Sequence, residues 1–157
     1  MFSNTAEYAL RAVMHLASHA DQARTAKEIS EIARIPVGYA SKVLQDLVQA
    51  GIVDSRRGPN GGFRLVRPPA RITVLEVINA VDPIQRITKC PLNLPEHATK
   101  LCRLHQELDN AIATVQAALA SATFADMLEG DRRAPKFQFP TLEGGDVAAQ
   151  RGVKKAK

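Results

Sequence analysis

The stretch that decides the fold is IPVGYASKVLQDLVQAGIVDSRRGPNGGFRL, residues 35–65. Its first half repeats apolar residues at helical spacing, which predicts a helix over 37–50 that ends at Gly51 in a left-handed cap. Its second half reads as a strand, a glycine-rich turn and a second strand, the pattern of a β-hairpin. A helix followed at once by a hairpin with a basic tip is typical of a winged helix.

The residues before this stretch predict two more helices. Asn4 is expected to cap the first, with Glu7 as its capping-box partner, and Thr25 with Glu28 opens the second. The sequence Arg-Ile-Pro at 34–36 then ends the second helix, which gives a helix-turn-helix. The expected buried face of the first helix contains Ala6, Ala9, Leu10, Val13, Leu16 and Ala17.

The residues after the hairpin predict a short helix, a loop and a long helix. Thr73 and Glu76 form a third capping box, and Asp82 with Pro83 ends the short helix that follows. From about Lys100, apolar residues recur at gaps of three and four, which predicts a seam for packing on another helix. We interpret this seam as a homodimer interface; docking within the chain is the alternative. The seam residues are Leu101, Leu104, Leu108, Ile112, Val115 and Leu119.

The chain of 157 residues is long enough for one domain of ordinary size with an appendage. We predict a mainly α fold with a small β-hairpin. The predicted organisation is a winged helix-turn-helix DNA-binding domain over 1–83, a cysteine- and histidine-bearing loop over 84–99, a dimerisation helix region over 100–130 and a disordered tail over 131–157. Apolar residues make up 45% and aromatic residues 4%, so aliphatic side chains must build the core.

The charge balance favours an anionic partner without identifying it. Lysine and arginine number 21 against 16 acidic residues, which gives a net charge of +5, and the sequence pI is near 9.5. The N-terminal residues resemble neither a signal peptide nor a membrane span. We therefore expect a cytoplasmic protein with no membrane contact, whose two cysteines stay reduced or bind metal.

The helix-turn-helix and the hairpin predict a surface for double-stranded DNA. The first turns of the second helix of such a motif enter the major groove, and the hairpin contacts the neighbouring backbone or minor groove. A phosphate-binding loop of the GxxxxGK[ST] type is excluded, because a strand rather than a helix follows Gly62. The predicted DNA-binding residues are Tyr39, Ser41, Lys42, Arg56, Arg57, Gly58, Asn60 and Arg64.

Several segments together resemble the Rrf-two (BadM) family of bacterial winged-helix transcriptional regulators, the IscR/NsrR type. They are TAEYALRAVMHLA, IPVGYASKVLQDLVQAGIV, RRGPNGGFRL, ITVLEVINAVD, CRLHQELDNAI and TFADML, within about residues 1–130. The resemblance implies a dimeric repressor or activator that binds partly palindromic promoter sites and crosses its long C-terminal helices. It also implies that residues 39–42 read the groove and that Arg57 with its glycines makes the wing contact.

Cysteine and histidine gather between the short helix and the long one, as Cys90, His97, Cys102 and His105 in a C-x6-H-x4-C-x2-H arrangement. Two thiolates and two imidazoles suit a tetrahedral zinc site or a [2Fe-2S] centre. Many relatives hold an iron-sulfur cluster with three cysteines here, whereas this chain has two, so the resemblance does not carry the cluster over whole. In some relatives an acidic residue of the first helix completes the cluster, and Glu7 stands at that position.

We predict a transcriptional regulator that acts as a dimeric repressor and senses redox state, iron or nitric oxide through an iron-sulfur cluster. The alternatives are a regulator with a structural zinc, a regulator with no metal, and direct thiol sensing. An adaptor that contacts protein instead of DNA is a further alternative, and a thiol-dependent enzyme is remote because no nucleophile motif is present. His15 and His19 are expected to be ordinary surface or boundary residues.

Overall fold

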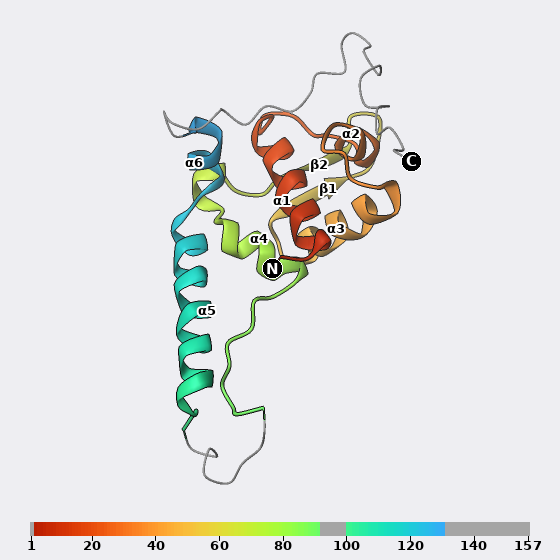
Figure 1. Ribbon diagram of the computed structural model, residues 1–157. Coiled ribbons are helices and arrows are strands. Elements are labelled where there is room, and N and C mark those ends of the chain that lie inside the picture. Colours follow the sequence, from red (N-terminus) through yellow and green to blue (C-terminus); the bar gives the residue numbers. More distant parts are fainter. Residues whose placement is uncertain (1, 92–99, 131–157) are drawn as a thin grey trace, which may run out of the picture.

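The computed structural model describes residues 2–91 and 100–130 of the chain. Helices α1 (Asn4–Ala17), α2 (Ala26–Ile32), α3 (Val37–Gln49) and α4 (Val74–Val81) form a head, to which a hairpin of β1 (Val53–Arg56) and β2 (Gly62–Leu65) belongs (Figure 1). The short helices η1 (Pro69–Arg71) and α6 (Phe124–Glu129) complete the head. Helix α5 (Arg103–Ser121) extends away from it, and we call α5 with the neighbouring segment 83–91 the arm. The predicted mainly α fold with a small hairpin is confirmed.

Helix α1 is the centre of the head and packs on α2, α3, α4, α6 and β2. Its N-cap is Ser3 rather than the predicted Asn4: Ser3 Oγ accepts a hydrogen bond from the amide of Ala6 at 3.1 Å. Two capping residues stand side by side in the sequence, and the helix begins one residue earlier than predicted. The core around α1 is aliphatic, with Leu16, Ile29, Leu44, Leu47, Ile52 and Ile72 among its fully buried side chains.

The turn between α2 and α3 is fixed by α1. Arg34 adopts a left-handed conformation with φ of 50°, and the two carbonyl groups at the end of α2 face Arg11. Arg11 Nη1 donates to the carbonyl oxygens of Ala33 at 3.2 Å and Arg34 at 3.3 Å. A cation at a helix C-terminus satisfies carbonyls that have no partner within the helix. The helix-turn-helix is therefore held in one geometry by the helix that precedes it.

The hairpin is fastened to the head by its second strand. Arg24 and Phe63 exchange two backbone hydrogen bonds, of 2.9 and 2.8 Å, which add a one-residue third strand to the sheet. Gly62 adopts φ of 145°, and a Cβ there would lie 2.6 Å from the carbonyl oxygen of Arg24. A Cβ at Gly61 would lie 2.2 Å from the carbonyl oxygen of Arg56. These two glycines thus permit close approach of the protein's own backbone, a role that was not predicted for them.

The predicted helical region over 100–130 is divided in two. Helix α5 ends at Ser121, and Thr123 with Asp126 forms a capping box that opens α6. Phe124, 2% exposed, returns into the core of the head, and its amide donates to the carbonyl oxygen of Ile72 at 3.1 Å. The chain is thereby anchored to the head beyond the arm. Among the described helices, none is both long and apolar enough to cross a membrane.

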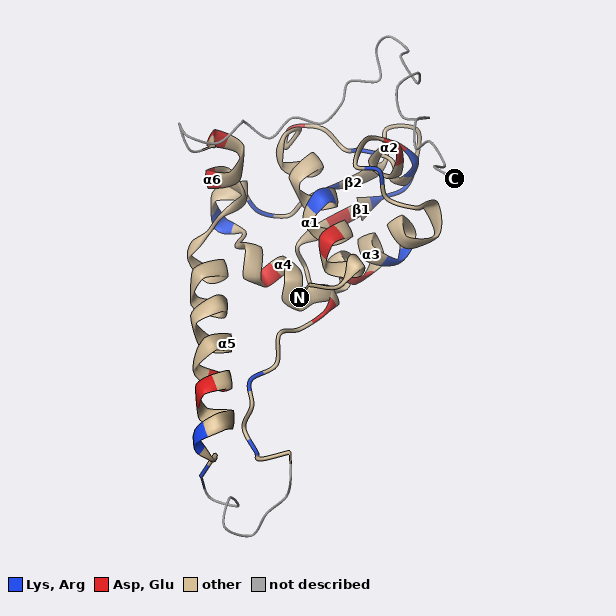
Figure 2. Ribbon diagram, in the orientation of Figure 1, with Lys and Arg blue, Asp and Glu red and all other residues tan. Residues whose placement is uncertain are grey.

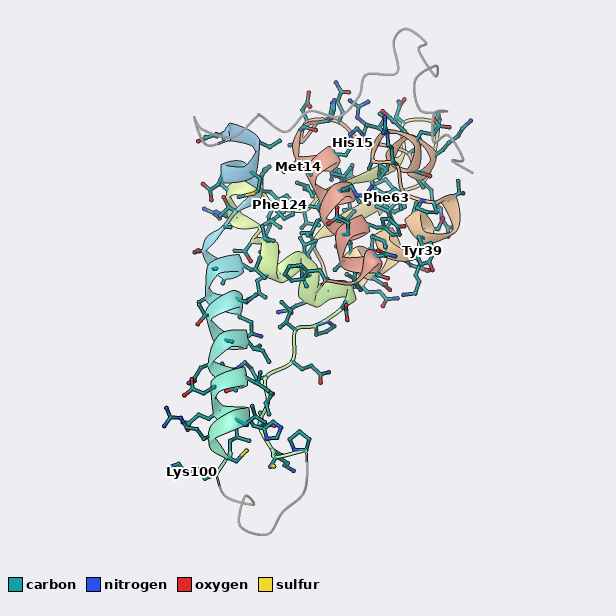
Figure 3. All side chains as sticks on the ribbon, viewed as in Figure 1. Met14, His15, Tyr39, Phe63, Lys100 and Phe124 are labelled. Atoms are coloured by element: carbon teal, nitrogen blue, oxygen red, sulfur yellow. The ribbon has the colours of Figure 1, made fainter. Side chains whose placement is uncertain are left out.

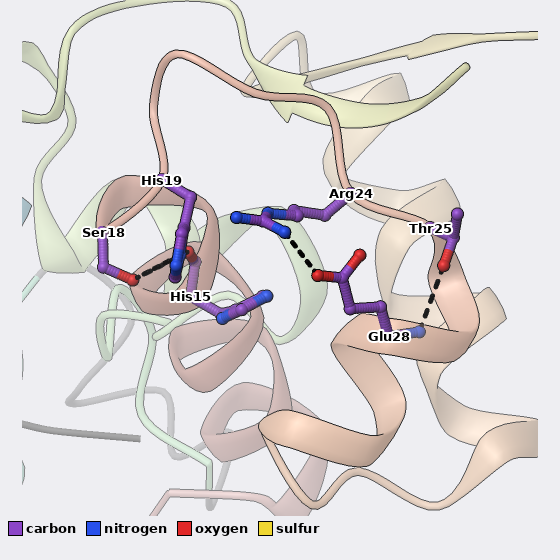
Figure 4. A network of polar contacts seen from close by, with 6 residues as sticks. All are labelled: His15, Ser18, His19, Arg24, Thr25 and Glu28. Atoms are coloured by element: carbon purple, nitrogen blue, oxygen red, sulfur yellow. Dashed lines mark hydrogen bonds and ion pairs between the residues drawn. The ribbon is translucent and has the colours of Figure 1, made fainter. Parts of the chain in front are cut away.

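His15 was expected at the surface or at the boundary of the core and is instead fully buried, so that prediction was wrong. It lies on the inward side of α1 near Arg24 and Glu28, which form an ion pair of 2.6 Å (Figure 4). The His19 ring lies 4.9 Å away, centroid to centroid. Burial, and secondarily the charge of His19, lowers the pKa of His15 from 6.5 to about 4. The imidazole is accordingly neutral at physiological pH.

Candidate nucleic-acid interface and metal centre

Helix α3 presents the predicted groove-reading residues at its outer surface, each in a different setting. Tyr39 lies near the start of α3 (Figure 3), and its ring packs at a tilt of 57° against Tyr8 of α1, with ring centroids 5.5 Å apart. Lys42 Nζ lies 3.2 Å from Asp46 Oδ2 one turn further on, so part of its charge is offset. Ser41 is exposed and lines a hollow between α3 and the hairpin. Of these three residues, Ser41 is therefore the one whose side chain has no ion pair or ring contact with another described residue.

The hairpin places three of the predicted wing residues at its exposed tip. Arg57, Gly58 and Asn60 lie in the turn between β1 and β2, and Gly58 has φ of 114° (Figure 2). Arg56 and Arg64 lie lower on the strands, where the Nε atoms of both approach Asp54 Oδ2, at 3.4 and 3.5 Å. One carboxylate thus offsets one of the two strand charges, whereas no ion pair joins Arg57 at the tip to another of the described residues.

The hollow beside α3 adds a residue that was not predicted from the sequence. Its lining is Ala26, Ser41, Gln45, Val48, Ser55 and Phe63. Gln45 is exposed on α3 and lies one turn beyond Ser41. The available signal was its position seven residues after Gly38, which places both on one face of the helix.

Three of the four predicted cysteine and histidine ligands converge at the end of the arm farthest from the head. The possible ligand atoms of Cys90, Cys102 and His105 all lie within 4.8 Å of one another. His105 Nδ1 is 3.2 Å from Cys102 Sγ and 3.7 Å from Cys90 Sγ, and Cys90 is 4% exposed. His97 lies outside the described residues. Glu7 lies on α1 in the head, 3.4 Å from Arg11 Nε, and does not join this group within one chain.

A polar clasp holds Cys90 opposite His105. The segment that carries Cys90 runs back along α5, and Asp109 of α5 accepts hydrogen bonds from Arg86 Nε at 2.6 Å and from the amide of Ile87 at 2.9 Å. The hydrogen bond from Arg86 lowers the pKa of Asp109. Further along, Gln116 Nε2 donates to the carbonyl oxygen of Ile84 at 2.8 Å. The clasp was not predicted from the sequence, because its partners are 23 residues apart and carry no shared motif.

The apolar seam of α5 is half-buried over most of its length and exposed at Leu104 and Leu108. None of the residues of α5 is buried, and Leu104 and Leu108 are 64% and 47% exposed. The charged residues of α5 gather toward its start at Arg103, and the rest of the helix is uncharged (Figure 2). A helix with an uncovered apolar face is expected to pack on another surface.

Comparisons with known proteins agree with this architecture. The model of the Rrf2 family, described as an iron-dependent transcriptional regulator, matches residues 2–130. A protein of Aquifex aeolicus (strain VF5), described by inference as an HTH-type transcriptional regulator, is 30% identical over 143 residues, which cover 89% of this chain and 97% of the relative.

Solved structures share the fold. The structure of T. potens IscR is 25% identical, with a TM-score of 0.68, and the match covers 82% of this chain and 86% of that one. CymR (YrzC), the global cysteine regulator of B. subtilis, is 24% identical with a TM-score of 0.67, over 81% of this chain and 95% of that one.

The fold, a helix-turn-helix followed by a hairpin, is that of a winged-helix DNA-binding transcriptional regulator. The matched family narrows the class, since the match spans all of the described residues. The chain belongs to the Rrf2 (Rrf-two) family of transcriptional regulators.

Proposed function

We propose that this protein is a cytoplasmic, dimeric repressor that binds partly palindromic promoter sites and responds to redox state, iron or nitric oxide through a [2Fe-2S] cluster. Membership of the Rrf2 family supports the regulatory role. The observation that carries the sensor is the convergence of Cys90, Cys102 and His105 at the end of the arm. The DNA contacts, the dimer and the cluster are each supported by a different part of the chain.

The DNA contacts follow from the outer surface of α3 and the tip of the hairpin. The start of α3 enters the major groove, and Arg57 with Asn60 reaches the adjacent phosphates or minor groove. Lys42, Arg56 and Arg64 already have carboxylate neighbours and contribute less attraction than their number suggests. Tyr39, whose ring rests on Tyr8, is suited to a phosphate contact through its hydroxyl.

The test of DNA binding uses promoter fragments from the protein's own gene neighbourhood. We expect tighter binding to such a fragment than to random DNA of equal length, with an affinity that falls steeply as salt rises. Equal affinity for both, in oxidised and in reduced protein, would contradict the regulator. Arg57→Ala separates a DNA reader from a protein adaptor, because only DNA binding loses a salt-sensitive contact. Arg71→Ala is a matched control, since Arg71 is an exposed arginine of η1, which packs on α6 and lies outside the proposed surface.

The dimer follows from the exposed seam of α5. Two copies crossing through this seam cover Leu104 and Leu108 and place two heads at a fixed separation. Half-sites of a palindromic operator lie about one helical turn, roughly 34–36 Å, apart. The arm therefore determines whether both copies of α3 reach the groove at once.

The three converging residues fit a metal centre. Donors around a single tetrahedral zinc ion lie about 3.5–3.8 Å apart, given bond lengths of about 2.0–2.3 Å, and the contacts of 3.2 and 3.7 Å are similar. The same trio would supply three of the four ligands of a [2Fe-2S] cluster, and the fourth would come from His97 or from the partner chain. When bound, the cluster supplies one-electron chemistry and sensitivity to oxidants. The description of the matched family as an iron-dependent transcriptional regulator favours iron over zinc.

The chain's own residues connect this centre to the head. Cys90 belongs to the segment that leaves α4, whereas Cys102 and His105 belong to the start of α5, so holding all three together fixes the segment against the helix. Asp109 keeps that segment in register when it accepts from Arg86 and Ile87. Release of Cys90 leaves the segment held to α5 only by the contacts of Asp109 and Gln116, and this looser attachment shifts the head relative to the arm and changes the separation of the two copies of α3.

Anaerobic purification followed by iron, sulfide and zinc analysis tests the sensor. We expect iron and acid-labile sulfide in equal amounts, with visible absorbance that is lost in Cys102→Ser. One zinc per chain without sulfide would favour the structural alternative. A colourless, metal-free dimer would contradict both.

A further inference from the structure

We propose that Gln45 determines operator sequence by reading one adenine in the major groove of each half-site. This inference rests on the proposed DNA-binding function and deepens it. Gln45 was absent from the residues that the sequence predicted for the groove. Three observations lead to this inference: the face of α3 on which Gln45 lies, the contacts that its neighbours make, and the hydrogen-bonding chemistry of its amide.

The buried residues of α3 define which face points away from the head. They are Ala40, Val43, Leu44 and Leu47. The opposite face, at about 100° per residue, carries Gly38, Lys42, Gln45 and Gln49. Gln45 is two turns, or about 10 Å, beyond Gly38 along the helix axis. A helix that enters the groove with its N-terminus thus carries Gln45 over base pairs further along the same groove.

Gly38 and Lys42, the neighbours of Gln45 toward the start of α3 on this face, compete little with it for a base contact. Gly38 has no side chain, and Lys42 is held 3.2 Å from Asp46. No hydrogen bond joins the Gln45 amide to another of the described residues, and its side chain borders the hollow toward Ser55 of the hairpin. The amide therefore projects from the middle of α3 on the side where DNA lies between helix and hairpin.

The chemistry of the side chain favours a base over a phosphate. An amide both donates and accepts, which matches N6 and N7 of adenine in the major groove. Lys42 and Asp46 offset each other beside Gln45, so this part of α3 has little net charge to attract phosphate. The uncompensated cation at the hairpin tip, Arg57, lies elsewhere. A neutral bidentate group in a charge-balanced setting is suited to sequence discrimination.

Selection from a randomised duplex pool tests the proposal with the full-length protein. We expect the wild type to enrich a palindrome with a fixed adenine in each half-site. Gln45→Ala should lose the preference at that position alone and bind the enriched site about 5- to 150-fold more weakly, with unchanged affinity for random DNA. Gln45→Glu should shift the preference to cytosine, whose N4 amino group donates to a carboxylate. Gln49→Ala, on the same face one turn further on, should keep the wild-type preference.

A modified base gives a second readout. Replacing the enriched adenine with 7-deazaadenine removes the N7 acceptor and should weaken wild-type binding but leave Gln45→Ala unaffected. Identical preferences in wild type and Gln45→Ala would overturn the inference, and so would an equal loss of affinity for all duplexes, which indicates a phosphate contact. If the wild type itself enriches no sequence, the proposed function fails, a result distinct from either of these. Gln45 is exposed, so its substitutions should leave the fold intact, which circular dichroism checks.

Discussion

The head and the arm differ in how many residues they bury within one chain. Helix α1 buries eight of its residues within the chain, whereas α5, which is longer, buries none. The head has an aliphatic core of its own. The arm is held to its neighbouring segment by polar contacts, chiefly at Asp109 and Gln116, and its apolar seam is exposed at Leu104 and Leu108. The difference indicates that the head can fold within a single chain, whereas α5 of the arm needs a second apolar surface to cover its exposed leucines.

The largest expected effect comes from removing the anchor beyond the arm. Phe124→Ala deletes a fully buried ring and leaves a cavity in the head, which should lower the free energy of unfolding by about 3–5 kcal/mol. Urea unfolding followed by circular dichroism measures it. Met127→Ala, on the exposed side of the same helix, is the control and should change stability far less. A small loss for Phe124→Ala would show that α6 belongs to the arm instead.

Acidification should weaken the head through His15. The pKa of this imidazole is about 4 in the folded chain, against 6.5 for an ordinary solvated histidine, so the unfolded chain binds the extra proton. The stability contribution is complete above pH 6.5 and is lost as pH falls toward 4, by about 3 kcal/mol. Unfolding free energies at pH 7 and pH 4.5 should differ less in His15→Leu than in the wild type. Parallel pH profiles would contradict the burial of a neutral imidazole, and His19→Gln should keep most of the slope.

The seam of α5 should matter to association more than to folding. Leu108→Ala removes part of an apolar contact in each of two copies, about 1 kcal/mol per copy, which weakens dimerisation roughly 30-fold. Sedimentation velocity over a concentration series measures this. Gln106→Ala, exposed on the opposite side of α5, should leave the dimer unchanged. If Leu108→Ala and Gln106→Ala weakened the dimer equally, or if neither weakened it, the seam would not be the dimer interface.

The smallest expected effect is that of Asp109→Ala, which should change hydrogen exchange only in the clasp. Asp109→Ala removes the acceptor for Arg86 and Ile87, so the Ile87 amide should exchange with deuterium faster while the denaturation midpoint of the head stays the same. The pKa of Asp109 is lowered, so the clasp is present above the ordinary carboxyl pKa and is lost as pH falls through the lowered value. Asn110→Ala is the neighbouring control. A drop in the midpoint with Asp109→Ala would show that arm and head unfold together.

Local signals in the sequence were sufficient for most of the head. Thr25 and Thr73 each cap the helix that was predicted from them, and Gly51 has the left-handed φ of 69° expected after α3. These features involve residues within one turn of each other. Helix caps and turns can therefore be predicted without knowledge of distant contacts.

Features that depend on distant contacts were not predicted. The burial of His15 needs the Arg24 and Glu28 region to cover it, and helical spacing alone does not state which polar residue lies under such a cover. The return of Phe124 to the core depends on a gap beside Ile72 that only the folded head creates. At the metal centre the residue types and their gathering were predicted, whereas the clasp that positions Cys90 was not.

The third strand at Arg24 reduces the conformational entropy that the hairpin would lose on binding a partner. An isolated two-stranded hairpin is marginally stable in water and would lose conformational entropy on meeting a partner. The backbone hydrogen bonds from Arg24 to Phe63 remove that freedom when the chain folds, and the glycine at 62 is what lets the two backbones meet. In the proposed complex the hairpin strands would therefore reach DNA already ordered, and their ordering would subtract nothing further from the affinity.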